Sequence, residues 1–159
     1  MKAAVLTISD GVAAGEREDA SGDVLEELLA ADRFSVRREL VPDDRPRIAR
    51  ALRVLAGDAE LILTTGGTGV APRDVTPEAT ASVLDRQVPG IAEAIRADSS
   101  SRTPHALLSR GVAGTIRNVL VVNLPGSPGG CRDGYAVLRP ALEHALGLLA
   151  GAETTHRQT

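Results

Sequence analysis

The most informative part of the chain is residues 64–78, which read TTGGTGVAPRDVTPE. The apolar residues 61–63 before it predict a buried strand, and Thr76-Pro77 predicts the start of a helix. The glycines between them allow a sharp turn that presents backbone N–H groups, and Asp74 adds a carboxylate for the divalent ion that nucleotide phosphates carry. The glycines alone fit a turn without a ligand equally well, but the whole string favours a phosphorylated ligand.

Two common phosphate-binding motifs do not fit this stretch. A Walker A loop needs a lysine after its last glycine, and Lys2 is the only lysine of the chain. A dinucleotide-binding fingerprint needs the spacing Gly-x-Gly-x-x-Gly, which residues 66–69 do not have. The sequence therefore predicts neither P-loop chemistry nor a dinucleotide-binding turn.

Length and composition indicate one cytoplasmic domain. We predict a single domain over residues 1–151 and a polar tail over 152–159 of the 159-residue chain. The net charge of −3 and the aromatic content of 1% argue against a nucleic-acid partner, because little is available for backbone neutralisation or base stacking. The first apolar run ends at Ser9-Asp10, too short for a signal peptide, and no run is long enough for a membrane span.

Cysteine and histidine chemistry is not expected to dominate. Cys131 is the single cysteine, so the chain has no internal disulfide, and we interpret this residue as a small buried side chain. The three histidines, His105, His144 and His156, lack the spacing of zinc ligands.

Strand-like and helix-like segments alternate along the chain. This order predicts an α/β fold, a three-layer α/β/α sandwich around a mixed, mostly parallel sheet. Ser21, Asp44 and Thr76 are expected to cap helices, and Pro140 is expected to kink or split the last helix. Strands are predicted at 3–8, 34–41, 59–65, 112–116 and 119–124, and helices from Ser21 and at 45–56, 76–84, 90–97 and 131–149.

In such folds, ligands bind beyond the carboxyl ends of the strands. Four loops should therefore share one rim: Ser9-Asp10, Pro42-Asp43, residues 66–74 and residues 125–128. We choose Asp43 and Asp74 as catalytic and metal-binding carboxylates, since Mg²⁺ needs one or two carboxylates together with ligand phosphates. Each could instead serve only a turn or a helix cap.

Further candidates surround these carboxylates. Thr65 and Thr68 have hydroxyls that could reach a phosphate, and the turn at 125–127 could bind a second anionic group, which would imply two substrates. Arg110 could bind phosphate or form a structural ion pair. The predicted substrate-binding residues are Ser9, Asp10, Thr65, Gly66, Gly67, Thr68, Gly69, Thr76, Ser109, Pro125, Gly126 and Ser127.

Five segments together resemble the Mog/MoaB family of molybdenum cofactor biosynthesis proteins, and the match spans nearly the whole chain. They are residues 64–80, Ser9-Asp10, Pro42-Asp43, Ser109-Arg110 with Ala113-Gly114, and residues 123–128 (NLPGSP). The resemblance implies a homotrimer and magnesium-dependent molybdopterin adenylyltransferase activity. AMP would pass from ATP to the terminal phosphate of molybdopterin, pyrophosphate would leave, and the product could be handed over to a molybdate-inserting enzyme.

The resemblance also implies roles for individual residues. It places the acidic positions needed for turnover on Asp43 and Asp74, the nucleotide turn on residues 66–69 and the pterin-side turn on residues 125–127. Two other functions stay open. One is a non-catalytic molybdopterin-binding carrier, and the other is a hydrolase of nucleotide pyrophosphates.

Overall fold

A computed structural model describes residues 1–151 of the chain, so the predicted tail at 152–159 lies outside the described residues. Its centre is a six-stranded sheet in the order β2-β1-β3-β6-β5-β4. The four strands from β2 to β6 run parallel, and β5 and β4 are antiparallel to their neighbours. The strands are β1 Lys2–Ile8, β2 Ser35–Val41, β3 Leu61–Thr65, β4 Arg86–Gln87, β5 Ala113–Ile116 and β6 Val119–Leu124.

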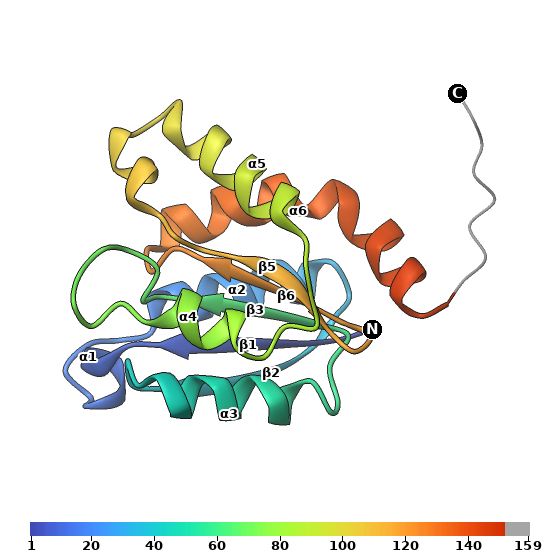
Figure 1. The fold of residues 1–159 in the computed structure, drawn as a ribbon, viewed down its shortest axis with the longest axis horizontal. Coiled ribbons are helices and arrows are strands. Elements are labelled where there is room, and N and C mark those ends of the chain that lie inside the picture. Colours follow the sequence, from blue (N-terminus) through green and yellow to red (C-terminus); the bar gives the residue numbers. More distant parts are fainter. Residues whose placement is uncertain (152–159) are drawn as a thin grey trace.

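Helices cover both faces of this sheet (Figure 1). The α-helices are α1 Asp10–Ala13, α2 Ala20–Ala31, α3 Arg45–Leu55, α4 Thr76–Ala81, α5 Pro89–Ser100 and α6 Pro128–Leu149, and η1 Pro104–Leu108 is a 3₁₀ helix. None of the helices within residues 1–151 is long and apolar enough to cross a membrane. The sheet is mixed and the fold is three-layered, as the sequence predicted.

Alternation along the buried strands creates the two cores. Successive side chains of a strand point to opposite faces of the sheet. In β1, Val5 packs with the core under α2, α5 and α6, whereas Leu6 packs with the core under α3 and α4. In β3, Leu63 packs in the same core as Val5, and Ile62 packs in the same core as Leu6. Both faces of these strands are buried, which explains their continuous apolar runs.

The helix boundaries correct two predictions and narrow a third. Asp19, not Ser21, caps α2, because its carboxylate accepts a hydrogen bond from Gly22 N at 3.0 Å. Thr76 is the first residue of α4 rather than its cap, and its hydroxyl donates to Gly66 O at 2.9 Å. Pro140 lies inside α6, which is one helix, so the predicted split is excluded and the kink stays a prediction. The prediction for Asp44 is confirmed, since it accepts from Arg47 N at 3.0 Å at the start of α3.

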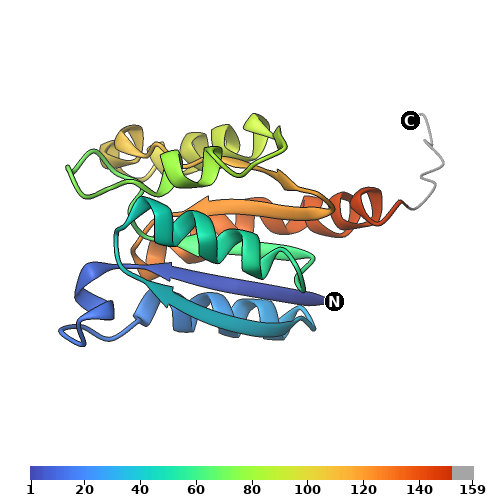
Figure 2. The ribbon, with the colours of Figure 1, turned by 60° about the horizontal axis from the view of Figure 1, so that its bottom comes forward.

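The parallel strands end at the same level. The register pairs Ile8 with Val41, Thr7 with Thr65, and Thr65 with Leu124. The loops that follow β1, β2, β3 and β6 therefore gather at one end of the sheet, away from the N-terminus (Figures 1 and 2). This arrangement places all four predicted rim loops together.

Asp32, the residue after α2, links that helix to α6 on the face of the sheet that both helices cover. Its carboxylate accepts hydrogen bonds from Tyr135 Oη at 2.7 Å and from Arg139 Nε at 2.7 Å. The Arg139 guanidinium, followed by the Tyr135 hydroxyl, lowers the pKa of Asp32 below its usual range. A carboxylate with a lowered folded-state pKa stabilises the fold above its unfolded pKa, and this stabilisation is lost as the pH falls through the folded pKa.

We expect Asp32→Asn to lower the free energy of unfolding at pH 7 by about 1–2 kcal/mol, because hydrogen bonds to a charged acceptor become neutral ones. The difference from the unmodified protein should shrink as the pH falls below about 4, the ordinary aspartate pKa, because Asp32 is protonated first in the unfolded chain and only at lower pH in the folded protein. Urea unfolding over a pH series measures both effects. Asp58→Asn is the control, since the ion pair of Asp58 with Lys2 is solvent-exposed. A difference for Asp32→Asn that stays constant with pH would contradict the assignment.

Candidate functional site

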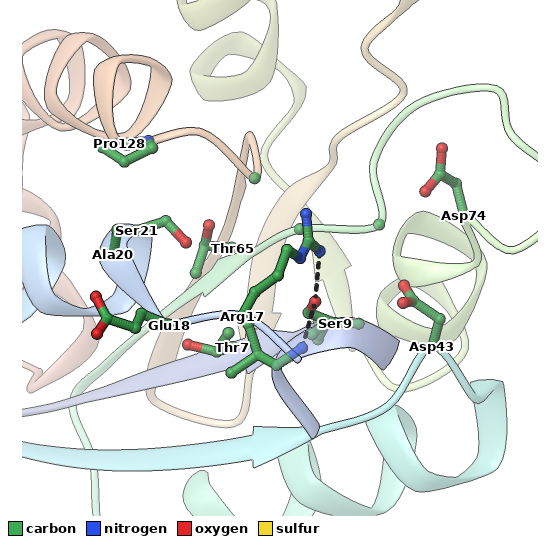
Figure 3. Close-up of a pocket in the computed structure, with 15 residues that line it drawn as sticks. Thr7, Ser9, Arg17, Glu18, Ala20, Ser21, Asp43, Thr65, Asp74 and Pro128 are labelled. Carbon is green, nitrogen blue, oxygen red and sulfur yellow. Dashed lines mark hydrogen bonds between the residues drawn. The ribbon is translucent and has the colours of Figure 1, made fainter. Parts of the chain in front are cut away.

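A pocket of about 410 Å³ opens at the end of the sheet where the four loops gather (Figure 3). Asp43 and Asp74 stand on one side of it, while the starts of α2 and α6 lie on the other. The two carboxylates therefore face one cavity. The lining consists of Thr7, Ile8, Ser9, Val12, Arg17, Glu18, Ala20, Ser21, Asp43, Thr65, Gly66, Gly67, Asp74, Gly126 and Pro128.

The turn after β3 can only be built from glycine at two positions. Gly66 has a φ of +99°, and a Cβ on it would lie 2.2 Å from the backbone oxygen of Ile8. Gly67 has a φ of +66°, and its Cβ would lie 2.4 Å from Thr76 Oγ1 and 2.9 Å from Asp43 Oδ1. Both backbone conformations are in the region that disfavours L side chains. Glycine at these positions lets the turn pack closely against the end of β1 and against Thr76 and Asp43.

Asp43 is a partly buried carboxylate among other carboxylates. Burial is the main factor that raises its pKa, and the negative charges of Asp10 and Asp74 raise it further, against the lowering effect of a backbone hydrogen bond from Asp10. Carboxylates that repel each other in this way are stabilised by a cation. Negative charge is therefore concentrated on the side of the pocket that holds Asp43 and Asp74, and a cation would be stabilised there.

The two carboxylates fit an incomplete site for a divalent ion. Asp43 Oδ2 accepts from Asp10 N at 2.9 Å, and Asp74 Oδ2 accepts from Ala71 N at 3.0 Å, which orients each group and leaves its Oδ1 for a ligand. No group of three or more His, Cys, Asp and Glu side chains is placed to hold a metal within residues 1–151. Mg²⁺ commonly takes one or two carboxylates and completes its shell with waters and phosphates. These residues thus suit an ion that arrives with a phosphorylated ligand.

Asp10 holds the rim loops together. Its backbone N–H donates to Asp43, its Oδ1 accepts from Asp43 N at 3.0 Å, and its carboxylate binds both Arg73 Nε and Arg73 Nη2 at 2.9 Å. The Arg73 guanidinium lowers the pKa of Asp10. This arrangement links α1 to the loops after β2 and β3, and it fixes the position of Asp43.

The structure divides the predicted substrate-binding residues into two groups. Ser9, Thr65, Gly66, Gly67 and Gly126 line the pocket with the two carboxylates. The other predicted residues are not part of this lining. These are Asp10, Thr68, Gly69, Thr76, Ser109, Pro125 and Ser127.

Hydrogen bonds explain the supporting roles of several residues in the second group. Pro125 O accepts from the Thr65 hydroxyl at 2.7 Å, and Ser127 caps α6 by accepting from Gly130 N at 3.1 Å. Cys131 lies beneath the same turn, and burial raises the pKa of its thiol to about 11. The interpretation of Cys131 as a buried side chain is therefore confirmed.

Arg110 clamps the loop after β3 instead of entering the pocket. Its guanidinium donates to Gly69 O at 2.7 Å and to Asp74 O at 2.8 Å, and it forms an ion pair with Glu78. Its backbone N–H also donates to Thr68 O at 2.8 Å. Of the two roles considered for Arg110, the structural ion pair is the one observed.

Sequence reasoning missed part of the lining. Thr7, Arg17 and Glu18 line the pocket, and so does Ser21, which was interpreted only as a helix cap. Arg17 comes from the polar loop after β1, and its Nη2 donates to Ser9 Oγ at 3.0 Å. The position of this loop after a buried strand was the one available signal, because nothing in its composition shows which side chain turns inward.

The fold and the pocket define an α/β domain with a polar pocket at the carboxyl ends of its parallel strands. A known family, described as "Probable molybdopterin binding domain", matches residues 4–144. The chain belongs to this family of molybdopterin-binding domains. The resemblance noted from the sequence motifs is thereby confirmed.

Named relatives agree with this membership. Molybdopterin adenylyltransferase of Helicobacter pylori strain J99 is 37% identical over 152 residues, covering 92% of this chain and 86% of that protein. Molybdenum cofactor synthesis protein cinnamon of Drosophila melanogaster is 39% identical over 159 residues, covering 98% of this chain. This chain spans 26% of the length of cinnamon and 48% of a bifunctional molybdenum cofactor biosynthesis protein of Synechococcus elongatus.

A solved structure has the same architecture. The molybdopterin biosynthesis enzyme MoaB from Thermus thermophilus superimposes with a TM-score of 0.88 at 49% sequence identity, covering 94% of this chain and 96% of the other. The Mog protein from Mycobacterium ulcerans gives a TM-score of 0.88 at 41% identity, with coverage of 93% and 98%. The predicted fold class is therefore confirmed by similarity as well as by topology.

Proposed function

We propose that this chain is a molybdopterin adenylyltransferase of molybdenum cofactor biosynthesis, with ATP and molybdopterin as substrates. An oxygen of the terminal phosphate of molybdopterin attacks the α-phosphorus of ATP. The new P–O bond forms as the bond to the β-phosphate oxygen breaks, and pyrophosphate carries the bonding electrons away. The observation that carries this proposal is that Asp43 and Asp74 line the same pocket as the Gly66-Gly67 turn.

The residues of the pocket act by positioning and by balancing charge. Phosphoryl-type transfers need little covalent help from the protein, because alignment of the attacking and leaving oxygens supplies much of the rate. The backbone of the Gly66-Gly67 turn lines the pocket on the triphosphate side, and the turn at residues 125–127 with the start of α6 faces the pterin substrate. No side chain has to act as a nucleophile.

Asp43 and Asp74 are proposed to hold Mg²⁺ that enters with ATP. When bound, the ion would neutralise the negative charge that develops on the phosphates. Burial, followed by the negative charges of Asp10 and Asp74, raises the pKa of Asp43, and a cation bound beside it would offset these effects. Asp10, held by Arg73, keeps Asp43 in place.

The proposal extends to assembly and context. We propose that residues 1–151 form one domain, that the protein is a cytoplasmic homotrimer, and that the adenylylated pterin is handed over to a molybdate-inserting enzyme. The names of the relatives support a place in molybdenum cofactor biosynthesis. Light scattering coupled to size-exclusion chromatography tests the trimer directly, and a monomeric mass would contradict it.

Incubation with molybdopterin, ATP and magnesium tests the reaction. We expect one pyrophosphate and one adenylylated pterin for each ATP consumed, measured by chromatography of both products. Omission of molybdopterin should stop ATP consumption, and chelation of magnesium should stop product formation. Pterin binding without pyrophosphate release would support the carrier function instead, whereas ATP consumption without pterin would support the hydrolase.

A further inference from the structure

Arg17 is the one arginine in the lining of the pocket, and it is free of carboxylate partners within residues 1–151. Its guanidinium donates to the neutral Ser9 hydroxyl. The arginines near the rim differ, because Arg73 is bound to Asp10 and Arg110 to Glu78. A guanidinium that faces a pocket without a carboxylate partner is suited to an anionic ligand.

The position of Arg17 separates the two sides of the pocket. In Figure 3 it projects between the carboxylate side, with Asp43 and Asp74, and the side formed by Ser21 and Pro128 at the starts of α2 and α6. An anion next to Asp43 and Asp74 needs a metal ion to offset their charge. On the other side Glu18 is the one carboxylate of the lining, and an anion there can be neutralised by Arg17 directly.

Glycine at position 11 makes room for this guanidinium. A Cβ on Gly11 would lie 2.8 Å from Arg17 Nε, 3.2 Å from Nη2 and 3.3 Å from Cζ. The atoms in the way belong to the end of a flexible side chain, so an alanine at position 11 would displace the guanidinium without disturbing the backbone. The same position lies within α1, where alanine is favoured over glycine.

We propose that Arg17 binds the terminal phosphate of the acceptor and holds it opposite the metal-bound triphosphate. This inference rests on the proposed function for the identity of the acceptor. Arg17 and Ser9 form the acceptor phosphate site, and Asp43 and Asp74 form the nucleotide side. Arg17 thereby gives the pocket its selectivity for a phosphorylated pterin.

The test compares binding of molybdopterin with binding of its dephosphorylated form, measured by titration calorimetry without ATP. Arg17→Ala should raise the Kd for molybdopterin by about 10- to 100-fold, the loss expected for a charge-assisted hydrogen bond. Its Kd for the dephosphorylated pterin should not change. Gly11→Ala should weaken molybdopterin binding in the same direction, and Arg17→Lys should lose part of the affinity because the planar fork is missing.

Arg53→Ala is the control, because Arg53 is an exposed arginine on α3 outside the pocket lining. The affinity for ATP with magnesium should be the same in the Arg17→Ala variant and the unmodified protein. The inference would be overturned if Arg17→Ala bound molybdopterin with the same Kd as the unmodified protein. It would also be overturned if Arg17→Ala lost affinity for ATP alone. If the unmodified protein binds molybdopterin in a phosphate-dependent manner but releases no pyrophosphate, the proposed activity fails while the role of Arg17 stands.

Discussion

Asp74→Asn is expected to lower the rate of adenylyl transfer by at least about 100-fold, the range associated with loss of metal-assisted charge neutralisation. The substitution keeps the size of the side chain and an oxygen that can accept from Ala71 N, so the loop after β3 should keep its shape. What it removes is one negative charge from the side of the pocket where ATP and its ion bind. Molybdopterin binding should survive, because the acceptor lies on the other side.

Pyrophosphate release under saturating substrates measures this effect, and circular dichroism with pterin titration checks that the fold and the acceptor site persist. The matched control is Asp44→Asn. Asp44 is adjacent to Asp43 in sequence, but its carboxylate only caps α3, a role that asparagine fills equally well. Turnover of Asp74→Asn at the level of the control would remove Asp74 from the mechanism.

Gly66→Ala is expected to cause the largest loss of stability, about 2–4 kcal/mol in the free energy of unfolding. Two costs add at this position. A φ of +99° is strained for any residue with a side chain, and the added Cβ would lie 2.2 Å from Ile8 O. Because Ile8 is the last residue of the buried strand β1, its carbonyl group cannot move aside without disturbing the strand.

Gly129→Ala is the control for this substitution. Gly129 lies in the first turn of α6, and no atom lies within 4 Å of the position of its Cβ. Alanine should be neutral or slightly stabilising there, because glycine in a helix costs about 0.5–1 kcal/mol relative to alanine. Urea unfolding of both variants measures the contrast, and equal stability of the two would show that the turn after β3 tolerates a side chain.

Regular elements were predictable where periodicity and burial agreed. The continuous apolar runs of β1 and β6 predicted buried strands, and the strands predicted at 112–116 and 119–124 correspond to β5 and β6, which pair antiparallel. The two-residue strand β4 and the short helix α1 were missed, since neither has a pattern of its own. β4 exists because Arg86 and Gln87 pair with β5, a tertiary contact that local sequence does not express.

Tertiary contacts also decided which of several possible hydrogen-bond partners each polar side chain took. Ser21, Asp19 and Thr76 are all residue types that cap helices. Asp19 caps α2, and its carboxylate also accepts a hydrogen bond from the Thr7 hydroxyl and forms an ion pair with Arg38. Thr76 instead directs its hydroxyl to Gly66 O, because the loop after β3 folds back over it.

The amino-acid sequence by itself determined the alternation of strands and helices, the glycine turn after β3 and the acidic residues Asp43 and Asp74, because these depend on local conformation and side-chain chemistry. Only the tertiary structure decided which of the candidate residues face the pocket. Asp10 fixes the position of Asp43, Arg110 binds the loop after β3, and Arg17 lines the cavity. The physical reason is that parallel register brings distant loops to one level, and the direction of each long polar side chain then depends on which partner that packing places within reach.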